Sequence, residues 1–254
     1  MTFDLWHTLV YLEPDAEERY MQRQEALAVS LLADGLSADD GAARVRGAWL
    51  RERQRAIRSA ERGRSVPVQH QFDRAAHSLR SSARSSDYLA AMRAEVERTP
   101  FLRAPYALAT LRRLRERGWR IGVISNTVGE PGAFLRPLLN RMRIRPLVDT
   151  CVFSDELPWT KPSPAIFHDA LRRLHASPRQ TVHVGDGWSD VEGARRARLR
   201  AGILYTGLRR YGPSYRKQFA GPHRLRVAPE NTVARLDRLP AVVERLMSDG
   251  EAPR

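Results

Sequence analysis

The chain has 254 residues, of which 42% are hydrophobic and 28% are charged, and it carries 43 basic against 29 acidic residues for a formal net charge of +14. These proportions exclude a collagen-like repeat and wholesale disorder, while the positive charge suits a nucleic acid, an anionic substrate or a strongly solvated surface. No apolar stretch approaches the roughly 20 residues of a membrane span, and Cys151 has no second cysteine to pair with, so we expect a cytoplasmic protein.

The predicted elements begin with a short apolar strand over residues 1–5, which ends at Asp4. Helical periodicity then dominates, with no strand pattern, as far as residue 98. The helices predicted in this block cover residues 15–32, 38–62, 69–83 and 86–98. A break at Ser65–Pro67 and a serine-rich piece at 81–86 interrupt the helical pattern.

After Pro100 the pattern alternates between apolar strands and amphipathic helices. The predicted strands are 121–124, 151–153, 181–184 and 202–205, and the predicted helices are 105–117, 131–141, 164–175, 189–199 and 231–247. Such alternation predicts an α/β fold, a parallel sheet with helices on both faces. The first strand therefore belongs with the later ones, and we expect an α/β core over 1–10 and 100–254 with a helical insertion over 11–99.

Polar side chains follow the predicted strands where those strands end. They are Asp4, Ser125, Asn126, Thr127, Lys161, Asp186 and Asp190. Ligands bind at the carboxyl ends of the strands in an open parallel sheet, so we expect these groups to converge on one crevice.

Each of these groups has a chemical role if the ligand is a phosphate ester. Asp4 can attack phosphorus and form an acyl phosphate. Mg²⁺ held by Asp4 and Asp186 would offset the charge of the nucleophile and of the phosphate. Lys161 and the Ser125 hydroxyl would stabilise the phosphoryl oxygens. Asp190 would hold a metal-bound water, position Lys161 or complement the dipole of the helix that begins there.

Lysine is rare in this chain. Only Lys161 and Lys217 are lysines, so 41 of the 43 basic residues are arginine. A compact ammonium and a planar guanidinium are not interchangeable, which suggests a site at Lys161 that arginine cannot fill. The charge excess lies entirely in the α/β part, because residues 11–100 carry a net charge of only +1. A cationic crevice of this kind would attract a small phosphorylated substrate.

Four motifs, in this order and each at a predicted strand end, resemble those of the haloacid dehalogenase superfamily. The matching residues are Asp4 to Thr8, Ser125, Lys161 to Pro164, and Gly185, Asp186 and Asp190. The resemblance implies a Rossmann-like core with a helical cap that closes over the crevice and selects the substrate. It also implies a Mg²⁺-dependent phosphatase that acts through an aspartyl phosphate. The residues implied to bind the metal are Asp4, Asp186, Asp190 and, through its backbone carbonyl, Trp6.

One residue departs from the pattern of the phosphatases. They usually carry an Asp at the position of Trp6, where it protonates the leaving group, and indole cannot do this. Proton transfer is worth about 10²–10⁴-fold in rate, so slow hydrolysis is expected. His7 is a substitute acid and substrate-binding candidate, or simply a residue of the turn. The alternatives are a relative that binds without turnover and a metal-independent 2-haloacid dehalogenase, which the presence of Asp186 and Asp190 disfavours.

Residues 206–226 combine basic and aromatic side chains, a composition that can contact nucleic acid. Two Gly-Pro pairs in the same stretch are typical of a surface loop. We therefore do not expect nucleic acid as the partner, and we expect Asn126, Thr127 and His7 to contact a small substrate instead.

Overall fold

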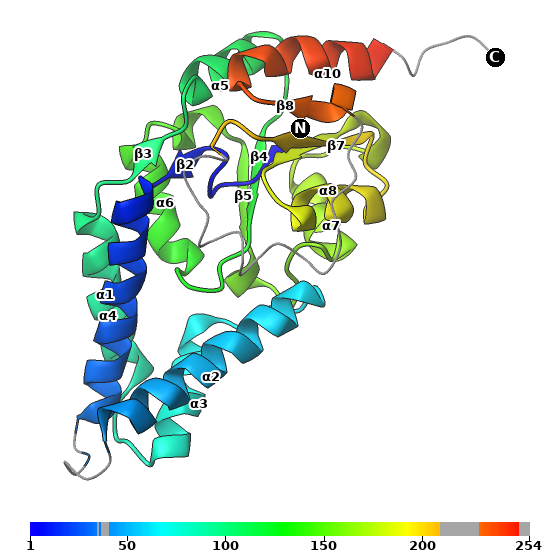
Figure 1. Cartoon of the computed structure of the whole chain (residues 1–254). Helices are drawn as coiled ribbons and strands as arrows, with labels where there is room; N and C mark the ends of the chain where they lie inside the picture. The colour runs from blue at the N-terminus through cyan, green and yellow to red at the C-terminus, as the bar shows by residue number, and fades with distance from the viewer. Residues whose placement is uncertain (35, 37–40, 209–228, 249–254) are drawn as a thin grey trace.

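The computed structural model describes residues 1–34, 36, 41–208 and 229–248. Its centre is a six-stranded sheet in which every neighbouring pair of strands is parallel (Figure 1). In spatial order the strands are β5 (Thr150–Phe153), β4 (Gly122–Ser125), β1 (Thr2–Phe3), β6 (Val182–Gly185), β7 (Ala201–Tyr205) and β8 (Thr232–Val233). The α/β fold expected from the alternating pattern is therefore confirmed.

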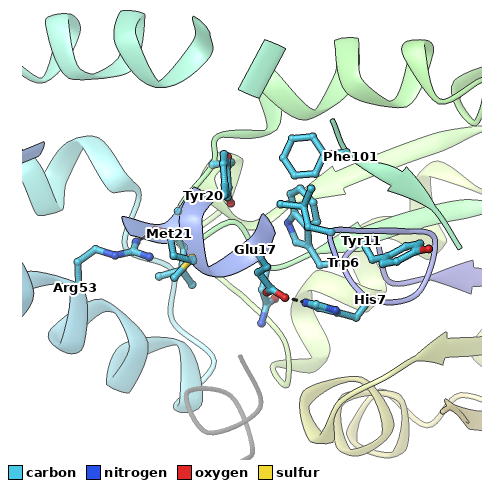
Figure 2. A pocket seen from close by; sticks show the side chains of 13 residues that line it. Trp6, His7, Tyr11, Glu17, Tyr20, Met21, Arg53 and Phe101 are labelled. Atoms are coloured by element: carbon cyan, nitrogen blue, oxygen red, sulfur yellow. Dashed lines mark hydrogen bonds and ion pairs between the residues drawn. The ribbon is translucent and has the colours of Figure 1, made fainter. Parts of the chain in front are cut away.

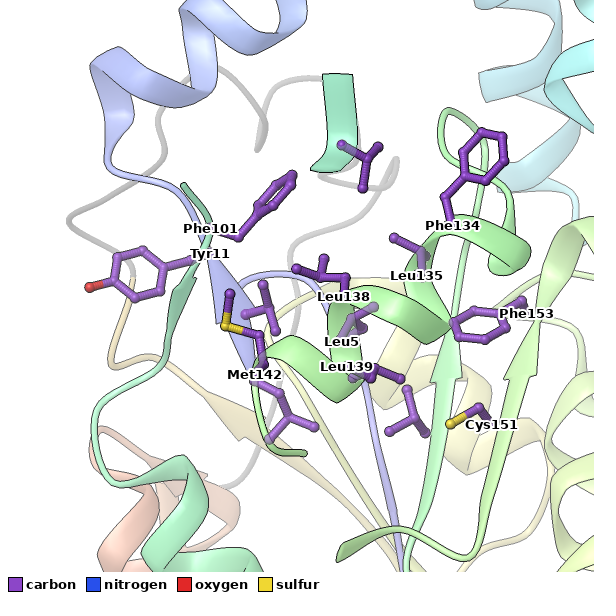
Figure 3. Packing of buried hydrophobic residues seen from close by; sticks show 14 of the residues in the cluster. Leu5, Tyr11, Phe101, Phe134, Leu135, Leu138, Leu139, Met142, Cys151 and Phe153 are labelled. Atoms are coloured by element: carbon purple, nitrogen blue, oxygen red, sulfur yellow. The ribbon is translucent and has the colours of Figure 1, made fainter. Parts of the chain in front are cut away.

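Helices cover both faces of this sheet, because successive side chains of a strand point to opposite faces. They are α5 (Ala107–Glu116), α6 (Gly132–Arg141), α7 (Pro164–Arg173), α8 (Trp188–Arg196) and α10 (Leu239–Ser248). In β4, Val123 packs in the apolar cluster that includes residues of α5, α6 and α10, whereas Ile124 packs in the cluster that includes residues of α7. Figure 3 shows the first face, where Leu135 and Leu139 of α6 lie over Phe153 and the buried Cys151.

The helical block of the sequence forms four helices that pack on one another (Figure 1). We refer to residues 14–98 as the helical segment. Its helices are α1 (Pro14–Ala33), α2 (Ala42–Glu61), α3 (Val68–Leu79) and α4 (Ser85–Arg98). Three aromatic rings join α2, α3 and α4: Tyr88 stacks on Phe72 at 4.8 Å and meets Trp49 edge-on at 5.4 Å between ring centroids.

The sequence pattern did not predict two short strands. β2 (Val10–Tyr11) and β3 (Leu102–Arg103) pair antiparallel where the chain leaves the sheet and where it returns from the helical segment. A strand of two residues is too short for an alternating pattern to be visible. The pair lies at the predicted boundaries of the insertion, and the division into a core over 1–10 and 100–254 and a cap over 11–99 stays a prediction.

The predicted helix at 231–247 was wrong in its first half. Thr232 and Val233 form the edge strand β8, and the α-helix begins only at Leu239. Thr232 and Val233 are β-branched, and Pro240 suits the first turn of a helix, where its missing N–H has no partner to lose. Most of the basic stretch at 206–226 lies outside the described residues. Among the described residues, no helix is long and apolar enough to span a bilayer.

Candidate active site

The amino group of Lys161 lies between two carboxylates in the buried interior. Its Nζ is 2.5 Å from Oδ1 of Asp4 and 2.6 Å from Oδ1 of Asp190. Asp4 directly follows β1, Asp190 is in the first turn of α8, and Lys161 precedes α7. The side chain of Lys161 is only 2% exposed. Three segments far apart in the sequence thus meet at the carboxyl ends of β1 and β6, as the strand-end argument predicted.

Asn126 holds the backbone of Lys161 from both sides. The amide N–H of Lys161 donates to Oδ1 of Asn126 at 2.8 Å, and Nδ2 of Asn126 donates to the carbonyl of Lys161 at 3.0 Å. The Asn126 side chain therefore ties the end of β4 to the loop that carries the lysine. Its predicted contact with substrate stays a prediction, while this contact with Lys161 gives it a definite structural role.

Asp190 uses both of its oxygens within the protein. Oδ1 accepts from Lys161 and from Nε2 of His183 at 3.2 Å, and Oδ2 accepts from the backbone N–H of Gly187 at 3.0 Å. His183 is fully buried, and its Nδ1 lies 2.9 Å from the Thr2 hydroxyl. Of the roles left open for Asp190, these contacts match two, the orientation of Lys161 and the capping of the N-terminus of α8, where Gly187 is the N-cap residue.

Sequence reasoning missed His183 and the reason for the glycine of the fourth motif. A signal for His183 was available, since it is a polar residue inside an apolar strand. Gly185 leaves room for the Asp190 side chain, because a Cβ at Gly185 would lie 2.2 Å from the Asp190 carboxyl carbon.

Three carboxylates in this crevice form a candidate metal centre. Asp4, Asp186 and Asp190 each place an oxygen within 4.8 Å of the others. Carboxylate oxygens are the ligands that Mg²⁺ prefers, so the donor set fits such an ion. Both carboxylate oxygens of Asp190 already accept hydrogen bonds, from Lys161 and from Gly187. Asp4 and Asp186 are therefore the better placed pair to bind a metal ion.

The pKa shifts of the site residues also favour Asp4 and Asp186 as the metal-binding pair. Burial raises the pKa of Asp4 to about 8 and that of Asp186 to about 6, although Lys161 opposes the shift at Asp4 and His7 that at Asp186. Burial alone would lower the pKa of Lys161, but Asp190 and Asp4 outweigh it and raise it to about 12. Burial likewise disfavours the Asp190 carboxylate, yet Lys161 and His183 hold its pKa below the usual range. We take Asp190 as the ionised partner of Lys161. Burial disfavours the carboxylate forms of Asp4 and Asp186, and a cation bound by these two residues would stabilise them.

The remaining hydroxyl groups of the predicted site differ in their surroundings. Ser125 ends β4, is fully buried, and its Oγ has no hydrogen-bond partner among the described residues. An unpaired buried hydroxyl costs free energy unless a ligand satisfies it. Thr127, by contrast, donates to Oδ1 of Asp155 at 2.6 Å and contacts Ser154, so its predicted contact with substrate stays a prediction.

Trp6 and His7 line a pocket between the sheet and the helical segment (Figure 2). The indole of Trp6 lies 5.3 Å from the ring of Phe101, and Nε2 of His7 lies 3.2 Å from Oε1 of Glu17 on α1. Burial lowers the pKa of His7, but the Glu17 contact and the nearby Asp186 and Asp4 outweigh it, so the net shift is upward. The pocket has a cavity volume of about 60 Å³. Its other lining residues are Tyr11, Leu12, Tyr20, Met21, Arg53, Asn126, Val128, Gly129 and Glu130.

A family model for haloacid dehalogenase-like hydrolases matches residues 1–198, which include Asp4, Ser125, Lys161, Asp186 and Asp190. The chain belongs to this family. Membership in this hydrolase family confirms the resemblance drawn from the four strand-end motifs. The helical segment lies within the matched residues.

Curated members of the haloacid dehalogenase-like hydrolases match part of the chain. A phosphoglycolate phosphatase of Pseudomonas putida is 35% identical over 97 residues, which are 38% of this chain and 35% of that protein. A glyceraldehyde 3-phosphate phosphatase of Methanothermobacter thermautotrophicus is 37% identical over 107 residues, 41% of this chain and 45% of that protein. The match therefore spans less than half the length of each of these relatives.

Solved structures of haloacid dehalogenase-like proteins match nearly the whole fold. A phosphatase from Thermococcus onnurineus has a TM-score of 0.63 at 20% identity, covering 95% of this chain and 96% of that one. A 2-haloacid dehalogenase from Pseudomonas syringae has a TM-score of 0.60 at 21% identity, covering 96% and 97%. At these identities the likeness concerns the fold alone, and it does not separate the two chemistries.

Proposed function

We propose that this haloacid dehalogenase-like hydrolase is a Mg²⁺-dependent phosphatase of small phosphomonoesters. The observation that carries the proposal is the meeting of Asp4, Asp186 and Lys161 at the strand ends. Ser125 ends the neighbouring strand β4, and its buried hydroxyl has no partner among the described residues. In this proposal Asp4 is the nucleophile, Asp4 and Asp186 are the cation-binding pair, and Lys161 and Ser125 are the donors to the phosphoryl oxygens. Two of the curated relatives are named as phosphatases of phosphoglycolate and of glyceraldehyde 3-phosphate, and these names support a small phosphorylated substrate.

In the proposed reaction an oxygen of Asp4 attacks phosphorus, and the bond from phosphorus to the leaving oxygen breaks. The ammonium of Lys161 and the hydroxyl of Ser125 donate to the phosphoryl oxygens as negative charge develops there. Water then attacks the phosphorus of the Asp4 acyl phosphate, and the bond from phosphorus to the Asp4 oxygen breaks. This step releases inorganic phosphate, restores the carboxylate, and frees one proton of the water, which ends on the leaving oxygen.

Asp4 and Asp186 would hold the metal ion, with the backbone carbonyl of Trp6 as a further proposed ligand. When bound, Mg²⁺ supplies positive charge that lets an anionic phosphate approach an anionic nucleophile. Asp190 keeps Lys161 oriented toward Asp4 in this arrangement. His183 supports Asp190 from the opposite side.

The pocket beside Trp6 would receive the leaving group. It adjoins the nucleophile in sequence through Trp6 and His7, and it adjoins Lys161 through Asn126. Its small volume suits a small organic group rather than a polymer. Aromatic rings of Trp6, Tyr20 and Phe101 form part of its wall (Figure 2), so a leaving group with an apolar surface is favoured.

The proposal is tested by phosphate release from para-nitrophenyl phosphate, phosphoglycolate and glyceraldehyde 3-phosphate. We expect hydrolysis with Mg²⁺ and its loss, by about 10²-fold or more, in excess chelator. Halide release from 2-chloropropionate in the chelator would instead identify a dehalogenase. Release of neither product from any substrate would identify a relative that binds without turnover, and the proposal would fall.

A change of Trp6 to Asp should raise turnover of alkyl phosphates relative to para-nitrophenyl phosphate. The new carboxyl can protonate a poor leaving group, while nitrophenolate needs no proton, so the ratio of the two kcat values should rise by about 10-fold or more. The change also removes the contact of the indole with Phe101. Trp6→Asn is the matched control, because it loses the same packing without gaining an acid. An equal ratio in both variants would show that another group already donates the proton.

A further inference from the structure

The helical segment makes backbone hydrogen bonds to the loop that carries Lys161. The turn between α2 and α3, residues 62–65, runs antiparallel to residues 158–160, with a bridge between Arg64 and Trp159. The N–H of Thr160 donates to the carbonyl of Gly63, and the N–H of Ser65 donates to the carbonyl of Pro158, both at 3.1 Å. The residue before Lys161 is therefore bound to the helical segment.

Gly63 also contacts the chain just after Lys161. A Cβ at Gly63 would lie 2.9 Å from Cβ and 3.2 Å from the backbone nitrogen of Ser163. The φ angle of Gly63 is +76°, a conformation that other residues rarely adopt. Only a glycine lets the turn approach this closely, and the contact reaches residues on both sides of Lys161 and Pro162.

A second set of contacts joins the helical segment to the loop after β4, which carries Asn126. The carbonyl of Val128 accepts from Nη1 of Arg53 on α2 at 2.7 Å and from Nε2 of Gln71 on α3 at 2.9 Å. Val128 is two residues from Asn126, which holds the Lys161 backbone. Both loops that position the lysine are thus bound by the helical segment.

We propose that the turn at residues 62–65 positions Lys161, with Gly63 as its positioning residue, so that displacing the helical segment from the sheet loosens the lysine. The reason is geometric. Lys161 must hold its Nζ within hydrogen-bond distance of Asp4 and Asp190, and a shift of about 1 Å in such a group is enough to cost about 10²-fold in rate. The catalytic consequence rests on the proposed phosphatase function, whereas the positioning does not.

The scarcity of lysine allows a test that needs no activity. An amine-acylating reagent modifies Lys161, Lys217 and the N-terminal amine, and mass spectrometry of the peptides gives a separate rate for each. In Gly63→Ala we expect the acylation of Lys161, corrected by that of Lys217, to rise by about fivefold or more, because the buried amine becomes accessible. Ser65→Pro, which removes the donor to Pro158, should raise it in the same way.

The matched control is Gly118→Ala. Gly118 has a φ of +79°, close to that of Gly63, but a Cβ there would meet no atom of the described residues within 4 Å. The Gly118→Ala variant carries the same backbone strain without touching the Lys161 loop. The acylation rate of Lys161 in this variant should therefore stay within about twofold of the rate in the unmodified chain. Equal rates in Gly63→Ala, Ser65→Pro and Gly118→Ala would overturn the proposal.

A second readout uses hydrolysis of para-nitrophenyl phosphate. Gly63→Ala should lower kcat/KM by about 10-fold in the wild-type background and have little further effect when combined with Lys161→Met, because it acts through that lysine. Equal losses in both backgrounds would make Gly63 merely structural and would contradict the proposal. A wild-type protein without hydrolysis, in which the acylation contrast still holds, would refute the phosphatase function and leave the positioning intact.

Discussion

Replacing Asp4 with Asn should abolish the hydrolysis of para-nitrophenyl phosphate, with a loss of at least about 10⁴-fold in kcat. An amide oxygen is a poor nucleophile, so no acyl phosphate forms in the variant. The substitution would also remove the carboxylate that lies 2.5 Å from Lys161 and one of the two carboxylates proposed to bind the metal. Single-turnover measurement of phosphate release, with the protein in excess over substrate, checks this directly.

Asp87→Asn is the control for this change. Asp87 is an exposed carboxylate on α4 that pairs with Arg84 at 3.4 Å, and it lies outside the crevice. Exposed ion pairs contribute only about 0–1 kcal/mol, so kcat should be unaltered in this variant. Similar activity in Asp4→Asn and in the unmodified protein would show that Asp4 is not the nucleophile, and the proposed reaction would have to be abandoned.

Lys161→Met should reduce both activity and stability. Loss of the ammonium removes a donor to the phosphoryl oxygens, for which a decrease in kcat of about 10²–10³-fold is expected. It also leaves Asp190, whose side chain is 3% exposed, without its cationic partner. Breaking a buried ion pair in this way costs about 3–5 kcal/mol in the free energy of unfolding. Urea titration followed by circular dichroism measures the second effect.

The sign of the pH dependence distinguishes this mechanism from lost packing. In the unmodified protein Lys161 and His183 overcome the effect of burial and hold the pKa of Asp190 low, so this carboxylate is stabilising at neutral pH and loses that effect only in acid. Without Lys161 a buried carboxylate takes up a proton more readily. The stability deficit of Lys161→Met should therefore shrink as the pH falls from 8 toward 5.

Arg173→Met provides the comparison for Lys161→Met. Arg173 is a partly exposed cation on α7 that pairs with Asp169 at 2.8 Å. Its removal should cost no more than about 1 kcal/mol and should not depend on pH in the same way. If the two variants lose equal amounts of stability at every pH, the carboxylate next to Lys161 is not the source of the deficit.

Much of this arrangement was predictable because strand ends in a parallel sheet converge. Asp4, Lys161 and Asp190 were named from their sequence positions alone, and the structure brings them within hydrogen-bond distance. The alternation of apolar strands and amphipathic helices likewise predicted the sheet and its two covered faces. Both features depend on local patterns that persist over many residues.

The features that escaped prediction depend on contacts between distant residues. The closeness of Gly63 to Ser163 joins residues 100 positions apart, and no local pattern marks either of them as a partner. Asn126 was expected to meet the substrate, and its amide geometry toward the backbone of Lys161 could not be read from its position after β4. The strands β2 and β3, of two residues each, were too short to show any periodicity.

The pairing of β2 with β3 joins the two stretches of chain that connect the helical segment to the sheet. The chain leaves the sheet and returns to it through this stem (Figure 1), so a rotation of the helical segment relative to the sheet would have its axis there. Near the stem, Arg141 of α6 donates to the carbonyls of Val96, Glu97 and Thr99 at the end of α4, which restrains that end. Gly63, which follows α2, lies where backbone hydrogen bonds join the helical segment to the loop of Lys161. A rotation about the stem that breaks these hydrogen bonds would therefore act directly on the loop of Lys161.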